Sequence, residues 1–331
     1  MKLQSLHIKN FKSIVDLAIV EPNPFTVFVG PNGSGKSNIF EALEFFYFIS
    51  AFTNQKTVDN SADISSLFGG PDTYLNRKNS QIESFAKFVI GEFWIKTNFK
   101  DLSLTEDDFD TDNEGLVDNL TKFLNTLHNF TKVFLHSQKE LKISFEGNIK
   151  LNAKSSNLEK VLKRILQDET KREEIKEWLE LFIPGFRDIQ VVSSELSNTD
   201  TLVIYEKGIE KPFTKDLLSD GTYNILALLT AVYQSDEPQF LCIEEPENGL
   251  HPKVIKELVH FFREACQEKG HYIWLNTHSQ TLVSELKPEE IILVNKKKGE
   301  TAIKQLTNHN LHGLSMDEAW LTAALGGGLP W

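Results

Sequence analysis

A phosphate-binding loop of the pattern G-x-x-x-x-G-K-[ST] is present at Gly30-Pro31-Asn32-Gly33-Ser34-Gly35-Lys36-Ser37. Its glycines let successive backbone N–H groups point inward around a polyphosphate, and the positive end of the following helix adds to that field. Lys36 is placed to reach the β- and γ-phosphates, and the Ser37 hydroxyl is placed to ligate Mg²⁺. A chance glycine-rich turn is the alternative, but the apolar strand 25–29 before the loop and the helical pattern after it supply the required context.

Two adjacent carboxylates, Glu244 and Glu245, end a second apolar run at 240–243. We expect this strand to lie beside strand 25–29, so that its end faces the γ-phosphate. Glu244 is then placed to hold Mg²⁺, and Glu245 to accept a proton from the attacking water. Adjacent residues on a strand point to opposite sides, so the two acids can take different roles. A solvated strand end is the alternative interpretation.

Two further motifs follow the order expected of such a site. Ser219, Asp220, Gly221 and Thr222 open a helix, and a capped helix start is a second place where an anion can bind. His278 follows a short apolar strand at 272–275. Alone, the first is an ordinary capping motif and the second is more often structural than catalytic. Here residues 219–222 precede the two glutamates and His278 follows them, all after the phosphate-binding loop. This order indicates that both motifs belong to the same nucleotide site.

The rest of the chain predicts an α/β fold, because strand and helix patterns alternate in it. Strands are expected at 3–10, 14–20, 82–97, 141–145, 189–194, 201–206, 239–244, 272–275 and 290–295. Helices are expected from the loop to about residue 50 and at 157–182 (one helix or a pair), 221–234, 252–268, 279–286 and 314–325. Residues 53–80 are expected to be irregular, and 101–115 to form an acidic loop. Residues 296–298, three lysines, are expected at a hairpin tip.

Composition limits the class of protein further. The 331 residues carry 35 basic and 47 acidic side chains, so the formal charge is 35 − 47 = −12. An acidic chain does not coat nucleic acid broadly, so any DNA contact must be local. No secretory signal or apolar run of membrane-spanning length is present, which predicts a cytoplasmic protein. The 24 phenylalanines indicate either a phenylalanine-rich core or a surface that another protein covers.

Together these motifs resemble those of the ABC-type ATPase family, in particular its RecF/SMC-like and OLD-like branch. The resemblance covers residues 1–50 and 187–295, and includes the opening segment 6–13 and the run 244–252. It implies a P-loop NTPase, an ABC-ATPase head with a mixed sheet, and a helical and β insert lobe at 51–186. It also implies ATP and Mg²⁺ as cofactors. The residues expected to contact ATP are Lys12, Asn32, Gly33, Ser34, Gly35, Lys36, Ser37 and Asn38.

The resemblance further implies a homodimer or a higher even oligomer, in which residues 219–222 of one chain cap the ATP of the other. Glu245, His278 and Lys36 are then catalytic, and Ser37 and Glu244 hold the metal. Asp220 in place of glycine and Glu244 in place of aspartate depart from the commonest pattern. The glutamine of the family's Q-loop has three candidates in this chain, Gln55, Gln81 and Gln138.

The chain is read as one ATPase domain over 1–331, with a C-terminal helix and tail at 314–331. It shows no sustained heptads for a long coiled coil, and too few residues follow His278 for the nuclease domain of OLD-type proteins. The leading hypothesis is therefore a switch that controls a separately encoded effector, such as a nuclease of an anti-phage defence system. The alternative is a RecF-like repair ATPase that acts directly on DNA. A transporter motor and an inactive scaffold fit the motifs less well.

Overall fold

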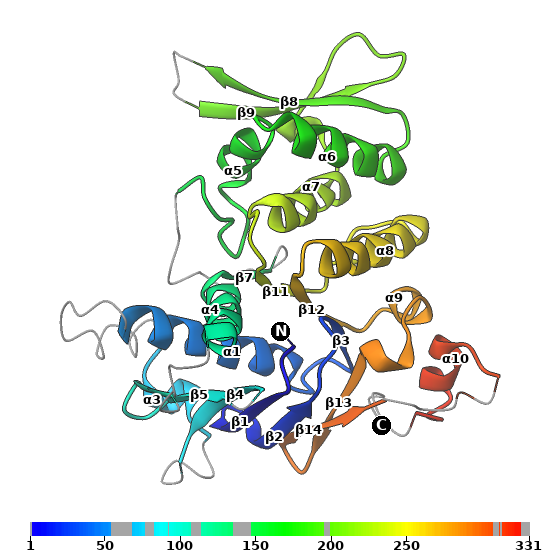
Figure 1. Cartoon of the computed structure of the whole chain (residues 1–331). Coiled ribbons are helices and arrows are strands. Elements are labelled where there is room, and N and C mark those ends of the chain that lie inside the picture. Colours follow the sequence, from blue (N-terminus) through cyan, green and yellow to red (C-terminus); the bar gives the residue numbers. More distant parts are fainter. Residues whose placement is uncertain are drawn as a thin grey trace.

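The structure is a computed structural model that describes residues 2–53, 68–76, 83–91, 93–106, 114–134, 147–194, 199–306, 311 and 313–325. Its centre is a six-stranded mixed sheet with helices above it and a second, antiparallel sheet below it (Figure 1). The predicted α/β P-loop fold with a mixed sheet is therefore confirmed.

The central sheet has the strand order β14-β13-β3-β12-β11-β7. Only the β13–β14 pair is antiparallel, because a short hairpin joins those two strands. The strands are β3 Phe25–Val29, β7 Phe130–Val133, β11 Phe240–Glu244, β12 Tyr272–Thr277, β13 Ile291–Lys297 and β14 Glu300–Gln305. The expectation that β11 lies directly beside β3 was wrong, because β12 pairs with both and separates them. Strands β3 and β11 are both buried on both faces. A continuous apolar run shows that a strand is central in a sheet, but not which strand pairs with it.

Successive residues of the central strands enter two different hydrophobic cores. Val27 and Val29 pack on the side of the long helices, whereas Phe28 between them packs on the opposite side. The same alternation separates Leu275 from Trp274 on β12. The strands read as continuous apolar runs because both faces of this sheet are covered.

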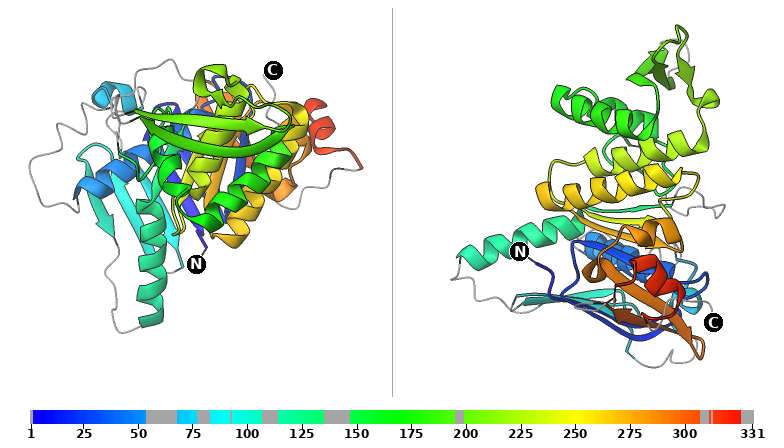
Figure 2. Two further views of the ribbon diagram at one scale, coloured as in Figure 1. Left: turned by 90° about the horizontal axis from the view of Figure 1, so that it is seen from above. Right: turned by 90° about the vertical axis from the view of Figure 1, so that its right-hand side faces the viewer.

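The first core is closed by helices and a small sheet on one face of the central sheet (Figures 1 and 2). These elements are α5 Leu158–Ile165, α6 Glu169–Phe182, α7 Asp220–Tyr233, α8 Pro252–Glu268, β8 Phe186–Ser194, β9 Thr199–Glu206 and β10 Phe213–Thr214. Residues 157–182 form a pair of helices rather than one. Asp168 starts the second helix, since its carboxylate accepts hydrogen bonds from the backbone N–H groups of Thr170 and Lys171.

The second core lies between the central sheet and a five-stranded antiparallel sheet of order β2-β1-β4-β5-β6, with helix α1 between them. These elements are β1 Ser5–Phe11, β2 Ile14–Val20, α1 Lys36–Thr53, α3 Pro71–Tyr74, β4 Phe85–Ile90, β5 Phe93–Asn98 and β6 Ser103–Glu106. The acidic segment 101–115 was expected to be a loop throughout, which is wrong for β6. The residues of β6 pair with the edge of β5. A strand of four residues is too short to show the alternation of apolar and polar residues that would have predicted it.

Several elements were missing from the sequence interpretation, among them the short helix α3, because residues 53–80 were expected to be irregular. Helix α4, Glu114–His128, contains glycine, asparagines and threonines, which are weak helix formers, yet Phe123 and Leu127 anchor it in the second core. Strand β7 has only four residues and is held by its parallel pairing with β11. The strand expected at 141–145 lies outside the described residues.

The C-terminal part adds two short helices, α9 Gln280–Ser284 and α10 Met316–Leu321. Both lie inside the helices expected at 279–286 and 314–325 but are shorter. The two cysteines, Cys242 and Cys266, are buried and free. Within the described residues, no helix is long and apolar enough to cross a membrane. Residues 326–331, which end the predicted tail, lie outside those described.

Candidate active site

The phosphate-binding loop connects the end of β3 to the start of α1 and requires glycine where the chain turns. Gly33 and Gly35 have φ angles of +76° and +104°, which side chains with a Cβ rarely adopt. A Cβ on Gly35 would also collide with the Thr301 hydroxyl of β14. The loop therefore packs directly against β14, whose Thr301 hydroxyl also donates to the Ser34 carbonyl oxygen at 3.2 Å.

Lys36 is buried inside this loop. Its ammonium donates to the carbonyl oxygens of Gly30 at 2.6 Å and Pro31 at 3.0 Å. Burial lowers the pKa of Lys36 below its usual value, and the nearby carboxylates of Glu245, Glu247 and Glu244 offset this only in part. The cation thus lies among acceptors that a phosphate oxygen can replace.

The remaining loop residues place donors around the same space. The Ser34 hydroxyl is buried and has no hydrogen-bond partner within the described residues, which leaves a polar group to be satisfied by a ligand. Asn32 and Gly33 are exposed at the loop surface. The Asn38 amide donates to the Ser13 hydroxyl at 2.6 Å, and the ammonium of Lys12 pairs with Glu41 of α1. Lys12 and Asn38 therefore lie at the start of the helix, where β1 turns into β2.

The two residues predicted to hold the metal are brought together. The Ser37 hydroxyl donates to Oε2 of Glu244 at 2.6 Å, although 207 positions separate them in the chain. Asn276 on β12 donates to the same oxygen at 3.3 Å. A hydroxyl and a carboxylate are hard oxygen ligands, so the donor set fits Mg²⁺, which takes its other ligands from water and phosphate. Among the described residues, no group of three His, Cys, Asp or Glu could hold a metal.

Lys132 of β7 is a site residue that the sequence interpretation missed. Its ammonium lies 3.1 Å from Oε2 of Glu44 and 3.5 Å from Oε1 of Glu244. Burial alone would lower the pKa of Lys132, but the two carboxylates outweigh it and raise the pKa. No sequence signal identifies this lysine, because strand β7 itself was not predicted.

Glu245, Asn248 and His278 form a second group immediately beside the first. Glu245 follows β11 with a φ of +49°, and its backbone N–H donates to the Asn276 carbonyl oxygen and to Asn276 Oδ1. One carboxylate oxygen lies 3.2 Å from Nδ1 of His278, and the other accepts from the Asn248 amide at 2.9 Å. The carboxylate is thus fixed on both sides, in a position where it can accept a proton.

Glu247 is a second missed residue. Its side chain is buried, one oxygen accepts from the Thr277 hydroxyl, and the other has no hydrogen-bond partner within the described residues. Burial raises the pKa of Glu247 above its usual value. Its position inside the acidic run 244–247 is the signal that could have indicated it.

Residues 219–222 begin helix α7 as predicted, with the Ser219 hydroxyl accepting from the Thr222 N–H at 3.1 Å. Within the described residues they make no hydrogen bond or ion pair with residues 30–38. They contact instead the segment that follows Glu245. A Cβ on Gly221 would lie 2.5 Å from the Gly249 carbonyl oxygen, and Asn224 donates to the Asn248 carbonyl oxygen at 3.1 Å. Gln55, Gln81 and Gln138 all lie outside the described residues.

The parallel strands, the phosphate-binding loop between β3 and α1, and the acids at the end of β11 define a P-loop ATPase of the ABC type. Residues 25–284 match the model of the family described as "AAA domain, putative AbiEii toxin, Type IV TA system", and the chain belongs to that family.

Curated relatives and solved structures place the chain near SMC and RecF proteins. It is 36% identical over 90 residues to the chromosome partition protein Smc of Methanocaldococcus jannaschii, covering 27% of this chain and 7% of that protein. It is 32% identical over 104 residues to the DNA replication and repair protein RecF of Shewanella piezotolerans, covering 30% and 27%. The chain thus matches only a small part of these relatives' lengths.

The Smc head domain of Pyrococcus furiosus with an extended coiled coil, bound to the C-terminal domain of ScpA, superposes with a TM-score of 0.57. The superposition covers 98% of this chain and 99% of that one, at 15% identity. The likeness confirms the SMC-type head fold.

Proposed function

We propose that the chain is an ATP-driven switch in which two copies close around two ATP molecules and reopen after hydrolysis. The observation that carries this proposal is the fixed Glu245 carboxylate between His278 and Asn248, next to the Ser37–Glu244 pair. Glu245 accepts the proton of the attacking water, and His278 orients the carboxylate. Lys36 exchanges its two carbonyl partners for phosphate oxygens.

Ser37 and Glu244 would hold Mg²⁺, which would neutralise charge on the β- and γ-phosphates of bound ATP. The protein holds these two oxygens in place with Asn276 and Lys132. In this arrangement the buried Ser34 hydroxyl gains the partner that it lacks.

The dimer is proposed because residues 219–222 make no hydrogen bond with their own phosphate-binding loop in the described part of the chain. Their helix start offers N–H groups and its positive end to an anion. If these groups serve the γ-phosphate, they serve the ATP of a second copy. Closure then depends on ATP, and hydrolysis resets it.

We infer that the switch acts on a separately encoded effector, and a nuclease of an anti-phage defence system remains the leading candidate. The Pyrococcus furiosus Smc head, which is bound to the C-terminal domain of ScpA, supports the idea that heads of this fold engage a second protein.

The test uses the Glu245→Gln variant, which keeps the size of the side chain and removes the base. With Mg²⁺ and ATP, native mass spectrometry or light scattering should show a dimer that persists, while phosphate release falls on the order of 100-fold or more. The same variant with Lys36→Ala should stay monomeric. Wild-type turnover by Glu245→Gln would disprove the assignment of the base.

A second candidate, direct DNA contact as in RecF, is favoured by the outer face of the antiparallel sheet. The cross-strand register aligns His7 with Lys87 and Lys87 with Lys96, and Lys9 lies two residues along β1. Lys87 also lies 4.3 Å from the ring centroid of Trp94. Asp16 pairs with His7 and Glu83 pairs with Lys96, so Lys9 and Lys87 beside the Trp94 ring are the groups that suit a phosphate backbone.

This candidate predicts that duplex DNA stimulates the ATPase and that Lys9→Gln/Lys87→Gln abolishes the stimulation without changing basal turnover. If DNA neither binds at low salt nor changes turnover, the RecF-like function is excluded.

A further inference from the structure

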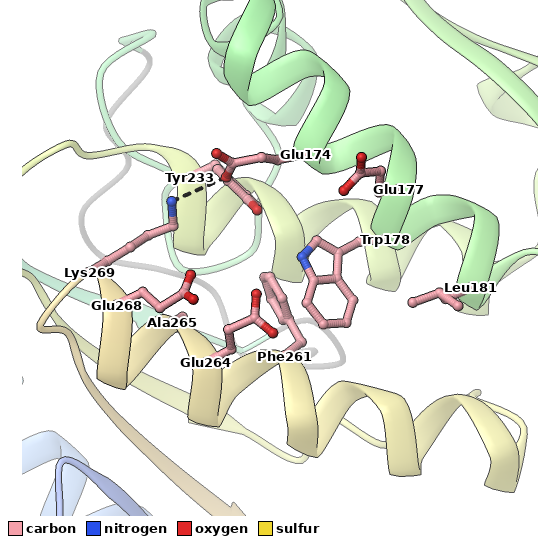
Figure 3. Close-up of a pocket in the computed structure, with 10 residues that line it drawn as sticks. All are labelled: Glu174, Glu177, Trp178, Leu181, Tyr233, Phe261, Glu264, Ala265, Glu268 and Lys269. Carbon is pink, nitrogen blue, oxygen red and sulfur yellow. Dashed lines mark hydrogen bonds and ion pairs between the residues drawn. The ribbon is translucent and has the colours of Figure 1, made fainter.

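A surface cleft lies between helices α6 and α8, with the end of α7 as its floor (Figure 3). Its volume is about 330 Å³, at the small end of the range for ligand sites. The lining of this α6–α8 cleft includes three aromatic and three acidic side chains, Trp178, Tyr233, Phe261, Glu177, Glu264 and Glu268.

Aromatic rings form the apolar part of the cleft. Trp178 packs edge-on against Phe261 with ring centroids 4.9 Å apart, and Tyr233 stacks on Phe261 at 6.2 Å. Leu181, one turn along α6, is 57% exposed at the mouth of the cleft. An indole ring that is only partly buried offers its face to a cation or to an aliphatic chain.

The cleft lining carries four carboxylates and one cation, Lys269, which also lies close enough to Glu264 to act on its charge. Lys269 pairs with Glu174 at 3.3 Å, which closes one end of the cleft. Glu177, Glu264 and Glu268 make no hydrogen bond or ion pair within the described residues. Partial burial, with Glu268 and Glu174 nearby, raises the pKa of Glu264 above its usual value. A cation entering the cleft would relieve this repulsion.

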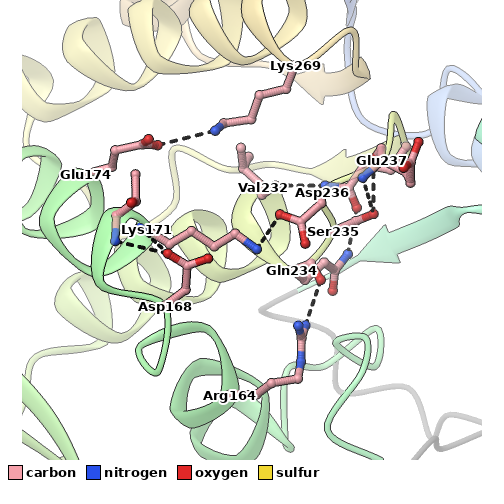
Figure 4. Close-up of polar contacts among 12 residues, drawn as sticks. Arg164, Asp168, Lys171, Glu174, Val232, Gln234, Ser235, Asp236, Glu237 and Lys269 are labelled. Carbon is pink, nitrogen blue, oxygen red and sulfur yellow. Dashed lines mark hydrogen bonds and ion pairs between the residues drawn. The ribbon is translucent and has the colours of Figure 1, made fainter.

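The walls of the cleft are held in place from behind (Figure 4). Arg164 of α5 donates to the Gln234 carbonyl oxygen at 2.7 Å, and Lys171 of α6 pairs with Asp236 at 2.5 Å. Both contacts fix the α5–α6 pair to the segment that leaves α7. The cleft is therefore formed before any ligand arrives, which lowers the entropy cost of binding.

The cleft is also remote from the nucleotide. Helix α7 starts at residues 219–222 and ends at Tyr233, so its 14 residues span about 20 Å. A dimer closed through the start of α7 would leave the cleft open to solvent.

We propose that the α6–α8 cleft docks a partner protein through an arginine or lysine side chain flanked by an apolar residue. The aliphatic stem of such a side chain covers Trp178 and Phe261, and its charged end reaches Glu264, Glu268 and Glu177. The apolar neighbour packs on Leu181 at the mouth. The net charge of −12 favours approach by basic partners. This surface extends the proposed function, since it gives the effector a contact with the rigid end of α7.

The test begins with a random peptide library displayed on phage, selected on the full chain without nucleotide. Peptides that bind wild type but not Glu264→Gln/Glu268→Gln should carry arginine or lysine next to an apolar residue. In fluorescence anisotropy, such a peptide should bind the double variant at least tenfold more weakly. Replacing its arginine by neutral citrulline should cause a similar loss.

The matched control is Glu173→Gln/Glu180→Gln, which removes two charges from the α6 face that does not line the cleft, and binding should be unchanged. The proposal is overturned if selected peptides lack basic residues, or if both double variants bind equally. It is also overturned if only spermidine binds in a cleft-dependent way, since the occupant is then a small polyamine. Because no nucleotide is present, this result is independent of the Glu245→Gln dimer test.

Discussion

Two lysines at the site, Lys36 and Lys132, differ in what surrounds their charge. Lys36 contacts carbonyl oxygens and its pKa is lowered by burial, whereas Lys132 contacts two carboxylates directly and its pKa is raised. The charge of Lys36 thus has no directly paired carboxylate among the described residues, so an anionic ligand can compensate it. The charge of Lys132 is already compensated by two carboxylates of the protein. This contrast supports a ligand-binding role for Lys36 and a positioning role for Lys132.

Removing the Lys132 charge should destabilise the fold. Lys132→Met leaves Glu44 and Glu244 close together without their cation, so the free energy of unfolding should fall by about 3 kcal/mol. Urea denaturation measures this change. Lys163→Met, which breaks a more exposed pair with Asp200, should cost about 1 kcal/mol or less. Equal losses in the two variants would contradict the buried-pair interpretation.

His271 should make the fold sensitive to mild acid. The ring is fully buried against Gln239 and the Val232 carbonyl oxygen, and burial lowers its pKa to about 4 from 6.5. Between these values the unfolded chain binds a proton that the folded chain does not, so stability falls as pH decreases from 6.5 to 4. The loss from this group should approach about 3 kcal/mol.

Urea denaturation at several pH values tests this effect. His271→Asn should be less stable at pH 7 but should lose less stability on acidification than wild type. The exposed His260→Asn should follow the wild-type profile. Parallel profiles for wild type and His271→Asn would show that His271 does not titrate in this range.

At the scale of elements, the start of α7 contacts the segment that follows Glu245, the proposed base. Gly221→Ala would place a methyl group 2.5 Å from the Gly249 carbonyl oxygen, so helix and segment must move apart. Turnover should fall on the order of tenfold or more, because a shift of this size disturbs Asn248 and through it Glu245. A coupled phosphate-release assay measures the effect.

Gly147→Ala is the matched control, because a Cβ at that position meets nothing within 4 Å. It should leave turnover unchanged. If Gly221→Ala also keeps full turnover, then the close approach of α7 to residues 248–250 has no catalytic role.

The same scale shows where sequence prediction succeeds and fails. Long periodic segments such as 252–268 were predicted with correct bounds, since one face packs on the sheet and the other meets solvent. Short elements such as β6 and β7 were missed, because pairing with a neighbouring strand decides them rather than any local pattern. Helix α4 was missed since its packing overrides weak helix propensity.

At the scale of the whole molecule, the proposed sharing of each active site by two chains predicts complementation between two inactive variants. Lys36→Ala removes a residue proposed to bind the phosphates, and Ser219→Arg blocks the surface proposed to cap the partner's ATP. Each variant alone should hydrolyse no ATP above background. A mixture should regain turnover, because a mixed dimer contains one site with both an intact loop and an intact cap. Absence of recovery, with mixed dimers shown by mass spectrometry, would contradict the shared site.

The phenylalanine content also finds its explanation at this scale. Within the described residues, no phenylalanine is among the large exposed hydrophobic side chains. Most of them fill the two cores on either side of the central sheet, for example Phe28, Phe45 and Phe261. The alternative of a phenylalanine-rich docking surface is therefore not needed for the described part of the chain.

The sequence by itself determined the class of protein, because the phosphate-binding loop, the two glutamates and His278 each have a local pattern. Only the tertiary structure decided which of these residues touch, since Ser37 meets Glu244 across 207 positions and β12 separates the two motif strands. It also decided the role of Lys132, whose strand has no sequence signal, and brought together the acids and rings of the α6–α8 cleft. The physical reason is that motifs depend on local backbone geometry, whereas pairing, burial and charge compensation depend on neighbours that are distant in sequence.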